Sequence, residues 1–521
     1  MDLSRRDFTK AAVLGSMAVG AAGLISACGS TSTKSTANAA PAKPKAGGSL
    51  RAAITGGGSS DTLDPLNAVN NSDFARVNNL FEPLFGLTPD AQPEYVLARE
   101  LTPNKDATKW VLRLQQGVTF HNGKEMTADD VIYTFQTILN PKAPTAAAAG
   151  LASIDMTGLR KLDKYTVSIP CRTPFATLQE ALSIPTYSSV IPVGFDPKAP
   201  VGTGPFKLVS FTPGQQSTFA RYDGYWQSRR PYLDQLVITD YNDETSQVSA
   251  LEAGQVDVAN LLSADVISAL EGRGKKVLIS KGGGWNPFTM RVDSAPFSDV
   301  RVRQAMRLIV DRPQMLDLVF GGYGTVGNDL FGIWAPEYDH GLPQRVQDID
   351  KAKALLKAAG QEDLTVELVT ADLAAGVVLS AEVFAQQAAQ AGVKVKVNQV
   401  TVSDFYGPSY LKWVFGQDFW YYNFYLPQAS LAELPTAPFN ETHFRNPAYN
   451  KLYAEAIATT DPAKRAELAH QMQVIEYNQG GYIIPFFPGV IDGYGENVHG
   501  LVPSKGGLSL NGYNFTNVWL S

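Results

Sequence analysis

The chain has few of the residues on which metal enzymes and thiol enzymes depend. Its 521 residues include only two cysteines and five histidines. No histidine stands in a His-Glu-x-x-His pattern, and no Cys/His cluster has the spacing of metal ligands. The sequence therefore disfavours a zinc enzyme, and we expect neither a metal nor a cofactor.

Motifs of other enzyme classes are also missing. The sequence has no Gly-x-Ser-x-Gly nucleophile elbow and no phosphate-binding loop that ends in Lys-Ser or Lys-Thr. A Gly-x-Gly-x-x-Gly string occurs at Gly322, Gly324 and Gly327, but it follows a predicted helix at 314–320 instead of a strand. We interpret it as a helix end and a turn. With 50 carboxylates, chance acidic pairs are common, so we assign none a glycosidase role.

The sequence also lacks a region of concentrated positive charge. The formal net charge is −6, and no run of basic residues occurs. A mildly acidic chain of this kind disfavours nucleic acid as a partner. It also disfavours attachment to a membrane through a basic patch, so any membrane attachment needs another kind of anchor.

The first 28 residues contain the pattern of such an anchor. Ser4-Arg5-Arg6-Asp7-Phe8 is a twin-arginine signature, residues 11–27 form an apolar run, and Leu24-Ile25-Ser26-Ala27-Cys28 resembles a lipobox. We expect an export signal at 1–27 and a lipid on Cys28 that anchors the protein on the extracytoplasmic face, in the cell envelope. A transmembrane anchor is the alternative, but a span needs about 20 strongly apolar residues. A double arginine also serves general basic signal regions, so the export route stays open.

The remaining chain is long enough for several domains. Removing residues 1–27 from 521 leaves 494 residues, which predicts two or three domains. Residues 28–47, with Cys28 at their start, are rich in Ser, Thr, Ala, Pro and Lys and predict a flexible linker. If Cys28 is lipidated, Cys171 has no partner within the chain. We expect Cys171 to be a small buried hydrophobic residue.

Beyond the linker, predicted strands and helices alternate. Residues 364–368 and 393–397 alternate as strands, and a helix at 376–391 lies between them, which predicts a parallel pair with a right-handed crossover. A second such unit joins 236–239 and 256–259 through a helix at 244–253. A hairpin is expected at 206–222, and further helices are expected at 127–140, 299–310, 348–359 and 462–479. We therefore predict an α/β protein with two lobes.

Aromatic residues concentrate in one segment, Phe419-Trp420-Tyr421-Tyr422-Asn423-Phe424-Tyr425. As a strand, it would send Trp420, Tyr422 and Phe424 to one face. Two interpretations stay open at this point. The segment is either a buried strand that supplies aromatic core, or the wall of a pocket that stacks on a ligand and offers phenol hydroxyls.

Several motifs resemble those of the solute-binding proteins of ABC importers, specifically the large peptide/nickel class. The most specific stretch runs from Trp110-Val111-Leu112-Arg113-Leu114 through Gly117-Val118-Thr119-Phe120-His121-Asn122-Gly123 to Thr127-Ala128-Asp129-Asp130-Val131. The resemblance covers nearly everything from Gly48 to the end. Further matches are Gly202-Thr203-Gly204-Pro205-Phe206, Tyr225-Trp226, Leu251-Glu252-Ala253-Gly254-Gln255-Val256-Asp257, Val302-Arg303-Gln304-Ala305 and Asp311-Arg312.

The resemblance implies a two-lobed, periplasmic-binding-protein-like α/β fold of type II, with a hinge between the lobes and an extra subdomain. It implies lobe I at 48–82, 200–285 and 485–521, the inserted subdomain at 83–199, and lobe II at 286–484. A solute would bind in the cleft and shift the hinge equilibrium toward closure. A membrane permease would recognise the closed form, and no covalent chemistry is needed.

The resemblance also directs attention to the aromatic segment. Peptide binders of this class often carry Trp-x-x-Asp-x-x-x-Pro in lobe II, where the acid pairs with the peptide's α-ammonium group. Here the stretch from Trp420 to Pro427 has Asn423 in place of the acid. An amide cannot neutralise a buried ammonium, so Asp418 is the alternative acid. The candidate ligand-binding residues are Trp285, Asp418, Trp420, Tyr421, Tyr422, Asn423 and Tyr425.

The favoured function is therefore a monomeric, lipid-anchored, non-enzymatic receptor that captures a small solute and delivers it to an ABC permease. Peptide is the leading ligand class. Because of Asn423, a blocked peptide, an oligosaccharide or a metal chelate remains an alternative. A secreted hydrolase is the competing function, disfavoured by the missing nucleophile and metal motifs. A ligand sensor without a permease is not separated from the importer by the sequence.

Overall fold

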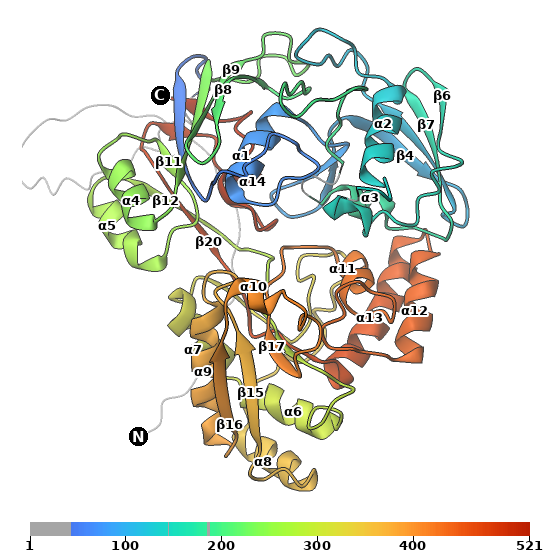
Figure 1. Cartoon of the computed structure of the whole chain (residues 1–521), viewed down its shortest axis with the longest axis vertical. Coiled ribbons are helices and arrows are strands. Elements are labelled where there is room, and N and C mark those ends of the chain that lie inside the picture. Colours follow the sequence, from blue (N-terminus) through green and yellow to red (C-terminus); the bar gives the residue numbers. More distant parts are fainter. Residues whose placement is uncertain (1–42, 144, 185–187) are drawn as a thin grey trace, which may run out of the picture. The chain divides into compact units, whose positions relative to one another are not determined.

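The computed structural model describes residues 43–143, 145–184 and 188–521 (Figure 1). The predicted export signal, Cys28 and most of the predicted linker lie outside these residues. Among the residues described, no helix combines the length and the hydropathy needed to cross a bilayer.

A seven-stranded sheet has the order β12-β20-β11-β1-β10-β9-β8. Its central strand β1 is parallel to both β10 and β11, and helix α4 (Glu244–Glu252) joins those two strands. The predicted strand–helix–strand unit is confirmed, with β1 inserted between its strands. The predicted hairpin is the antiparallel pair β8–β9. The strands are β1 Ser49–Thr55, β8 Phe206–Thr212, β9 Gln216–Arg221, β10 Gln235–Tyr241, β11 Val258–Ala259, β12 Lys276–Ser280 and β20 Val490–Tyr494.

A four-stranded antiparallel sheet, in the order β4-β5-β7-β6, lies within residues 98–170. Helix α2 (Ala128–Ile138) begins at a capping box formed by Thr127 and Asp130. Leu50 of β1 and Trp110 of β5 belong to the same hydrophobic core, so one continuous core extends from the seven-stranded sheet to this one. The strands are β4 Ala98–Pro103, β5 Lys109–Leu114, β6 Arg160–Asp163 and β7 Thr166–Pro170.

Cys171 follows directly after β7 and is buried, as the sequence predicts. Burial raises the pKa of its thiol to about 12, so the reactive thiolate is not formed near neutral pH. This side chain behaves as a small hydrophobic residue.

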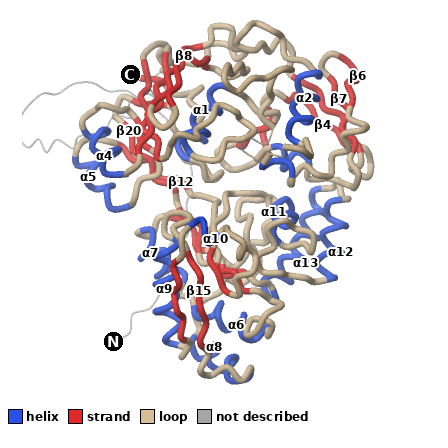
Figure 2. The backbone as a smooth tube through the Cα atoms, in the orientation of Figure 1, coloured by secondary structure: helices blue, strands red, loops and turns tan. Residues whose placement is uncertain are grey.

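A five-stranded sheet, in the order β16-β15-β17-β13-β18, lies within residues 288–483. Strands β15 and β16 are parallel and are joined by α9 (Val377–Gln390), which confirms the other predicted crossover unit (Figures 1 and 2). The strands are β13 Phe288–Met290, β15 Thr365–Thr370, β16 Lys394–Gln399, β17 Phe415–Gln417 and β18 Tyr482–Ile483.

Most predicted helices occur within one or two residues of their expected bounds. Helix α8 begins after Asp348, whose side chain accepts a hydrogen bond from the Lys351 N–H. Helix α7 ends before Gly321, which has the left-handed backbone that a turn there requires. The helices are α1 Asn71–Leu80, α3 Leu178–Leu182, α5 Ile267–Gly272, α6 Val300–Ile309, α7 Arg312–Phe320, α8 Ile349–Ala358, α10 Val402–Phe405, α11 Tyr425–Ala432, α12 Pro447–Ile457, α13 Pro462–Gln479 and α14 Ser509–Gly512. The short strand pairs are β2 Phe85–Leu87 with β3 Pro93–Tyr95, β14 Gly324–Val326 with β19 Phe486–Pro488, and β21 Val498–His499 with β22 Trp519–Leu520.

The prediction of a strand through residues 419–425 is wrong. Strand β17 ends at Gln417, Trp420 forms one isolated bridge with Trp285, and α11 begins at Tyr425. Pro427 lies in the first turn of α11, a position that suits proline because the helix makes no use of its missing N–H there. The aromatic side chains are therefore distributed by a loop and a helix start, without the alternation of a strand.

Two chain segments pass between the seven-stranded and five-stranded sheets. Residues 281–287 lead from β12 to β13, and residues 484–489 lead from β18 to β20. The two segments touch, because a Cβ on Gly282 would lie 2.1 Å from the carbonyl oxygen of Pro488. All strands of the seven-stranded sheet fall within the segments predicted for lobe I. The domain boundaries themselves stay a prediction.

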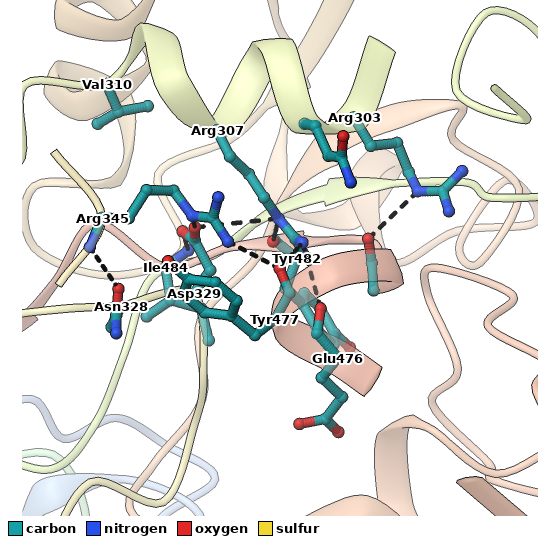
Figure 3. Close-up of polar contacts among 12 residues, drawn as sticks. Arg303, Arg307, Val310, Asn328, Asp329, Arg345, Glu476, Tyr477, Tyr482 and Ile484 are labelled. Atoms are coloured by element: carbon teal, nitrogen blue, oxygen red, sulfur yellow. Dashed lines mark hydrogen bonds and ion pairs between the residues drawn. The ribbon is translucent and has the colours of Figure 1, made fainter. Parts of the chain in front are cut away.

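A buried ion network crosslinks the part of the chain that holds the five-stranded sheet. Asp329 forms ion pairs of 2.7 Å with Arg312 and Arg345. Figure 3 shows Asp329 beside Arg345 and Arg307, and the Arg307 guanidinium lies 3.9 Å from its carboxylate. It further accepts a hydrogen bond from the Ile484 N–H, at the start of a crossing segment. The carboxylate of Asp329 thus binds three parts of the chain that are distant in sequence, at Arg312, Arg345 and Ile484.

The charges of this network depend on one another. Burial would raise the pKa of Asp329, but the three guanidinium groups outweigh burial and hold its pKa below the ordinary value. Burial lowers the pKa of Arg307 to about 9, and Arg307 donates hydrogen bonds to the backbone carbonyls of Tyr482, Glu476 and Tyr477. The negative charge of Asp329 is what makes these buried cations tolerable.

We predict that Asp329→Asn lowers the free energy of unfolding by about 3–5 kcal/mol, because it leaves buried arginines without a counter-charge. Chemical denaturation at pH 7 measures this change. Because the folded pKa of Asp329 is depressed, its stabilisation is present at neutral pH and is lost as pH falls below the ordinary Asp value of 3.8. Asp317→Asn, on the exposed side of α7, is the control and should change stability little. Equal stability of the two variants would contradict this role.

Candidate ligand-binding cavity

A cavity of 160 Å³ lies beside the aromatic segment and is lined by aromatic rings and one acid. Its walls come from the end of α10, the loop after it, the segment after β17 and the loop that follows α11. The lining residues are Tyr406, Tyr410, Asp418, Phe419, Trp420, Tyr421 and Phe439.

The rings of the cavity meet in near-perpendicular pairs. Tyr406 and Tyr410 have ring centroids 5.0 Å apart at 73°, and Phe419 and Tyr421 have theirs 5.5 Å apart at 83°. Trp420 and Phe439 form a third pair, 5.9 Å apart at 75°. Perpendicular pairs are a favourable aromatic geometry, and each pair builds a corner of the cavity.

Trp420 is held in place by a column of stacked rings. Its backbone exchanges two hydrogen bonds with Trp285, and the two indoles stack 5.8 Å apart at 10°. On its other side Trp285 stacks on Phe331, and Phe331 stacks on Tyr425. The far end of the column is fixed by the Tyr425 hydroxyl, which donates to the Glu476 carboxyl in α13.

Two buried carboxyl groups lie at the cavity. Asp418 is 3% exposed, and its Oδ1 accepts hydrogen bonds from the Tyr406 hydroxyl (2.7 Å) and the Phe419 N–H (2.8 Å). Glu441 is 5% exposed, and its Oε2 accepts from the Tyr482 hydroxyl at 3.0 Å and from Trp420 Nε1 at 3.4 Å.

Neither of these two acids has a positively charged side chain as a partner among the described residues. Burial, together with the nearby Asp418, raises the pKa of Glu441 well above its ordinary value, which favours its neutral form. Within the described residues, no Lys, Arg or His nitrogen lies within 4 Å of either carboxyl group. Burial also raises the pKa of Tyr406 and Tyr410, so both phenols stay neutral.

Three of the predicted ligand-binding residues line this cavity: Asp418, Trp420 and Tyr421. The Tyr421 side chain is 53% exposed, and its ring lies 6.4 Å from Phe74 of α1, a helix packed against the seven-stranded sheet. Tyr421 therefore brings one wall of the cavity close to a helix that packs on the seven-stranded sheet.

The other four predicted residues do not line it. Trp285 and Tyr425 are 1% and 0% exposed, because they form the inner part of the aromatic column. The Tyr422 hydroxyl donates to the carbonyl oxygen of Ala91 at 3.4 Å, and Asn423 Oδ1 accepts from the Phe424 N–H at 2.8 Å. Ligand contact by these four residues stays a prediction, although they do not line the cavity. The segment supplies aromatic core through Tyr425, but not as a buried strand.

The sequence did not predict the cavity residues Tyr406, Tyr410 and Phe439, or Glu441, which accepts a hydrogen bond from Trp420 of the wall. The four-residue spacing of Tyr406 and Tyr410, close before Trp413, is a signal that could have drawn attention to the first pair. Phe439 and Glu441 carry no comparable local pattern. They reach the cavity because the chain returns to it after α11.

A second, larger cavity of 400 Å³ is bounded by residues between 78 and 97 and between 500 and 517, with Ser183, Tyr225 and Gln227. Its buried acid is Glu82, whose carboxylate accepts hydrogen bonds from the Tyr225 hydroxyl and Trp226 Nε1. Burial raises the pKa of Glu82 to about 7. None of the predicted ligand-binding residues lies in this cavity, and its acid is already satisfied. We therefore place the candidate site at the smaller cavity.

Comparisons with known proteins agree with this architecture. Residues 92–444 match the family model described as the middle part of bacterial extracellular solute-binding proteins, family 5. The glutathione-binding protein GsiB of Pectobacterium atrosepticum is 26% identical over 450 residues, covering 81% of this chain and 85% of that protein.

Solved structures share the fold at lower identity. The substrate-binding protein CtaP from Listeria monocytogenes has a TM-score of 0.80 at 20% identity, covering 91% of this chain and all of that one. The oligopeptide-binding protein AppA from Bacillus subtilis, in complex with a nonapeptide, has a TM-score of 0.74 at 21% identity, covering 92% of this chain and all of that one.

These matches confirm the predicted two-lobed α/β class. The family model spans more than half of the chain, and it covers the motifs at 110–131, the five-stranded sheet up to β17 and all residues that line the cavity. The chain belongs to family 5 of the bacterial extracellular solute-binding proteins, which bind solutes for transport and are not enzymes.

Proposed function

We propose that this chain captures a small amino-acid-derived solute, with peptide as the leading class, in the cavity beside Trp420 and delivers it to an ABC permease. The observation that carries the proposal is the cavity itself. It combines aromatic walls with a buried carboxylate, at the place where Tyr421 approaches Phe74 of α1. Family membership supports transport as the purpose of binding.

The chemistry of the cavity suits such a solute. Trp420 offers a partly exposed indole face, and the phenols of Tyr406, Tyr410 and Tyr421 add polar tips to an otherwise apolar wall. Asp418 supplies a negative charge that can pair with an amine. Two relatives point the same way, since GsiB is named for glutathione and AppA was solved with a nonapeptide, and both ligands are peptides.

Closure is the second part of the proposal. We take the predicted lobes I and II as the moving bodies and residues 281–287 and 484–489 as the hinge. A solute held by the Trp420 cavity and by groups near Phe74 stabilises the state in which both surfaces reach it. The permease then distinguishes the closed, loaded form from the open one.

Attachment to the envelope is the third part. The lipobox at 24–28 supports a lipid on Cys28, and the composition of 28–47 supports a tether that leaves the binding body free to move. The twin-arginine signature supports export before anchoring. A monomer completes this part of the proposal.

We predict that peptides raise the melting temperature of the purified protein. A peptide at ~100 times its Kd should add about 2.7 kcal/mol to the free energy of unfolding. Trp420→Ala should abolish most of this gain, whereas Tyr95→Ala, at an exposed ring outside the cavity, should keep it. A thermal-shift screen of di- to oligopeptides measures both. Equal gains in Trp420→Ala and the native protein would place the site elsewhere.

We also predict that Asn423→Asp changes the affinity for free-amine peptides less than twofold. The Asn423 side chain accepts the Phe424 N–H and does not line the cavity, so an added charge there does not reach the bound amine directly. Titration calorimetry with one peptide identified by the thermal-shift screen measures the affinity. A gain of tenfold or more would show that position 423 holds the acid site found in other peptide binders.

A further inference from the structure

The two acids beside Trp420 form a pair. The side chains of Asp418 and Glu441 are hydrogen-bonded to each other, and both are buried, with 3% and 5% of their surface exposed. Two carboxylates cannot form such a bond, because neither carries a donor. One proton between the two groups supplies the donor and removes the repulsion between two buried charges. A pair of this kind carries a single negative charge.

The other contacts of Glu441 leave one of its oxygens for this proton. Glu441 Oε2 accepts hydrogen bonds from the Tyr482 hydroxyl and from Trp420 Nε1. Glu441 Oε1 is buried and meets no N–H or O–H donor among the described residues, which is costly for a bare carboxylate oxygen. A proton on Oε1 that points to Asp418 removes this cost. Asp418 Oδ1 already accepts two hydrogen bonds, so Oδ2 is the open acceptor.

Other buried acids without a salt bridge are satisfied in a different way. Three of them have both carboxyl oxygens occupied by N–H or O–H donors of the protein: Glu82, Glu476 and Asp492. Glu433 has an unpartnered oxygen, as Glu441 does, but Glu433 neighbours Glu476 and lines neither cavity. Glu441 differs from these acids because its partner, Asp418, lines the cavity beside Trp420.

A proton on Glu441 determines the charge that a ligand meets at Asp418. The Tyr406 hydroxyl and the Phe419 N–H also donate to Asp418. Together with Glu441 they direct three donors at this carboxyl group, and such donors favour the anionic form. The Tyr410 hydroxyl is a further neighbour of Asp418 and can accept a hydrogen bond as well as donate one. An ammonium group in the cavity therefore finds one carboxylate and one phenol oxygen.

We propose that Glu441 is a positioning residue for ligand binding. It donates its proton to Asp418 Oδ2 and holds Asp418 as the single anion that receives an ammonium group with N–H donors. The inference rests on the proposed function, because it assigns a further residue to the same cavity. Glu441 acts through Asp418 and does not itself touch the ligand.

Trialanine and its N-acetyl form test the amine that the pair receives. Titration calorimetry of the full-length protein at neutral pH should give binding about tenfold tighter, or more, for trialanine, because acetylation removes the charge and most of the N–H donors. Asp418→Asn should remove this preference. Equal binding of the two peptides, or no binding of either, overturns the proposal.

Variants of Glu441 separate a neutral donor from a charged acid. Glu441→Gln keeps the shape and an N–H donor toward Asp418, so the affinity for trialanine should change less than about threefold. Glu441→Leu removes the donor and should weaken trialanine about tenfold, while the N-acetyl form is unchanged. A tenfold loss in Glu441→Gln would show that Glu441 acts as a charged acid. Equal weakening of both peptides in Glu441→Leu would show that it only supports Trp420. Either result overturns the proposal.

Infrared difference spectroscopy tests the proton on the native protein and does not depend on the folding of a variant. Binding of trialanine should shift the C=O stretching band of a protonated carboxyl group, because the ammonium competes for the Asp418 oxygen that accepts this proton. Glu441→Gln should remove the shift, and Glu433→Gln, a matched buried acid outside the cavity lining, should keep it. No shift in the native protein, or an equal shift in both variants, overturns the proposal.

The proposed function and the role of Glu441 fail in different ways. If peptides stabilise the protein through Trp420, but acetylation and both Glu441 variants have no effect, the proposed function stands and the role of Glu441 fails. If no peptide depends on Trp420, both fail.

Discussion

The stacked column Trp420–Trp285–Phe331–Tyr425 is the interaction on which the rest of the site depends. Trp285 lies on the segment that crosses from one large sheet to the other, and Trp420 is a wall of the cavity. Tyr425 ties the opposite end of the column to Glu476 in α13. The column thus connects the core, the crossing segment and the binding surface. A rigid aromatic wall loses little conformational entropy on binding, which favours affinity for a small solute.

The distribution of buried charge supports the same division between structure and site. In the core, the buried carboxylate of Asp329 is neutralised by Arg312 and Arg345. At the cavity, Asp418 has no cationic partner among the described residues, and burial raises the pKa of the neighbouring Glu441. The acid and the aromatic walls together mark the cavity as a candidate place for a ligand.

The connection between the two large sheets bears on the proposed closure. Each large sheet has its own hydrophobic core, and two short segments that touch at Gly282 and Pro488 connect them. Few backbone segments need to change conformation for the two cores to move as bodies. The ion network around Asp329 reaches Ile484, at the start of one connecting segment, so the proposed hinge begins beside a crosslinked part of the core.

Local patterns in the sequence determined the regular elements and the family. Helix α13 occupies 462–479 as predicted, α8 is capped by Asp348, and both parallel crossover units occur, because periodicity, caps and glycine stops act over a few residues. Tertiary structure alone decided how the aromatic segment is used. Six of the seven residues from 419 to 425 are aromatic, so no local pattern distinguished Trp420 and Tyr421 at the cavity from the buried Tyr425. Phe439 and Glu441 joined the site only through long-range packing, which short-range sequence signals do not encode.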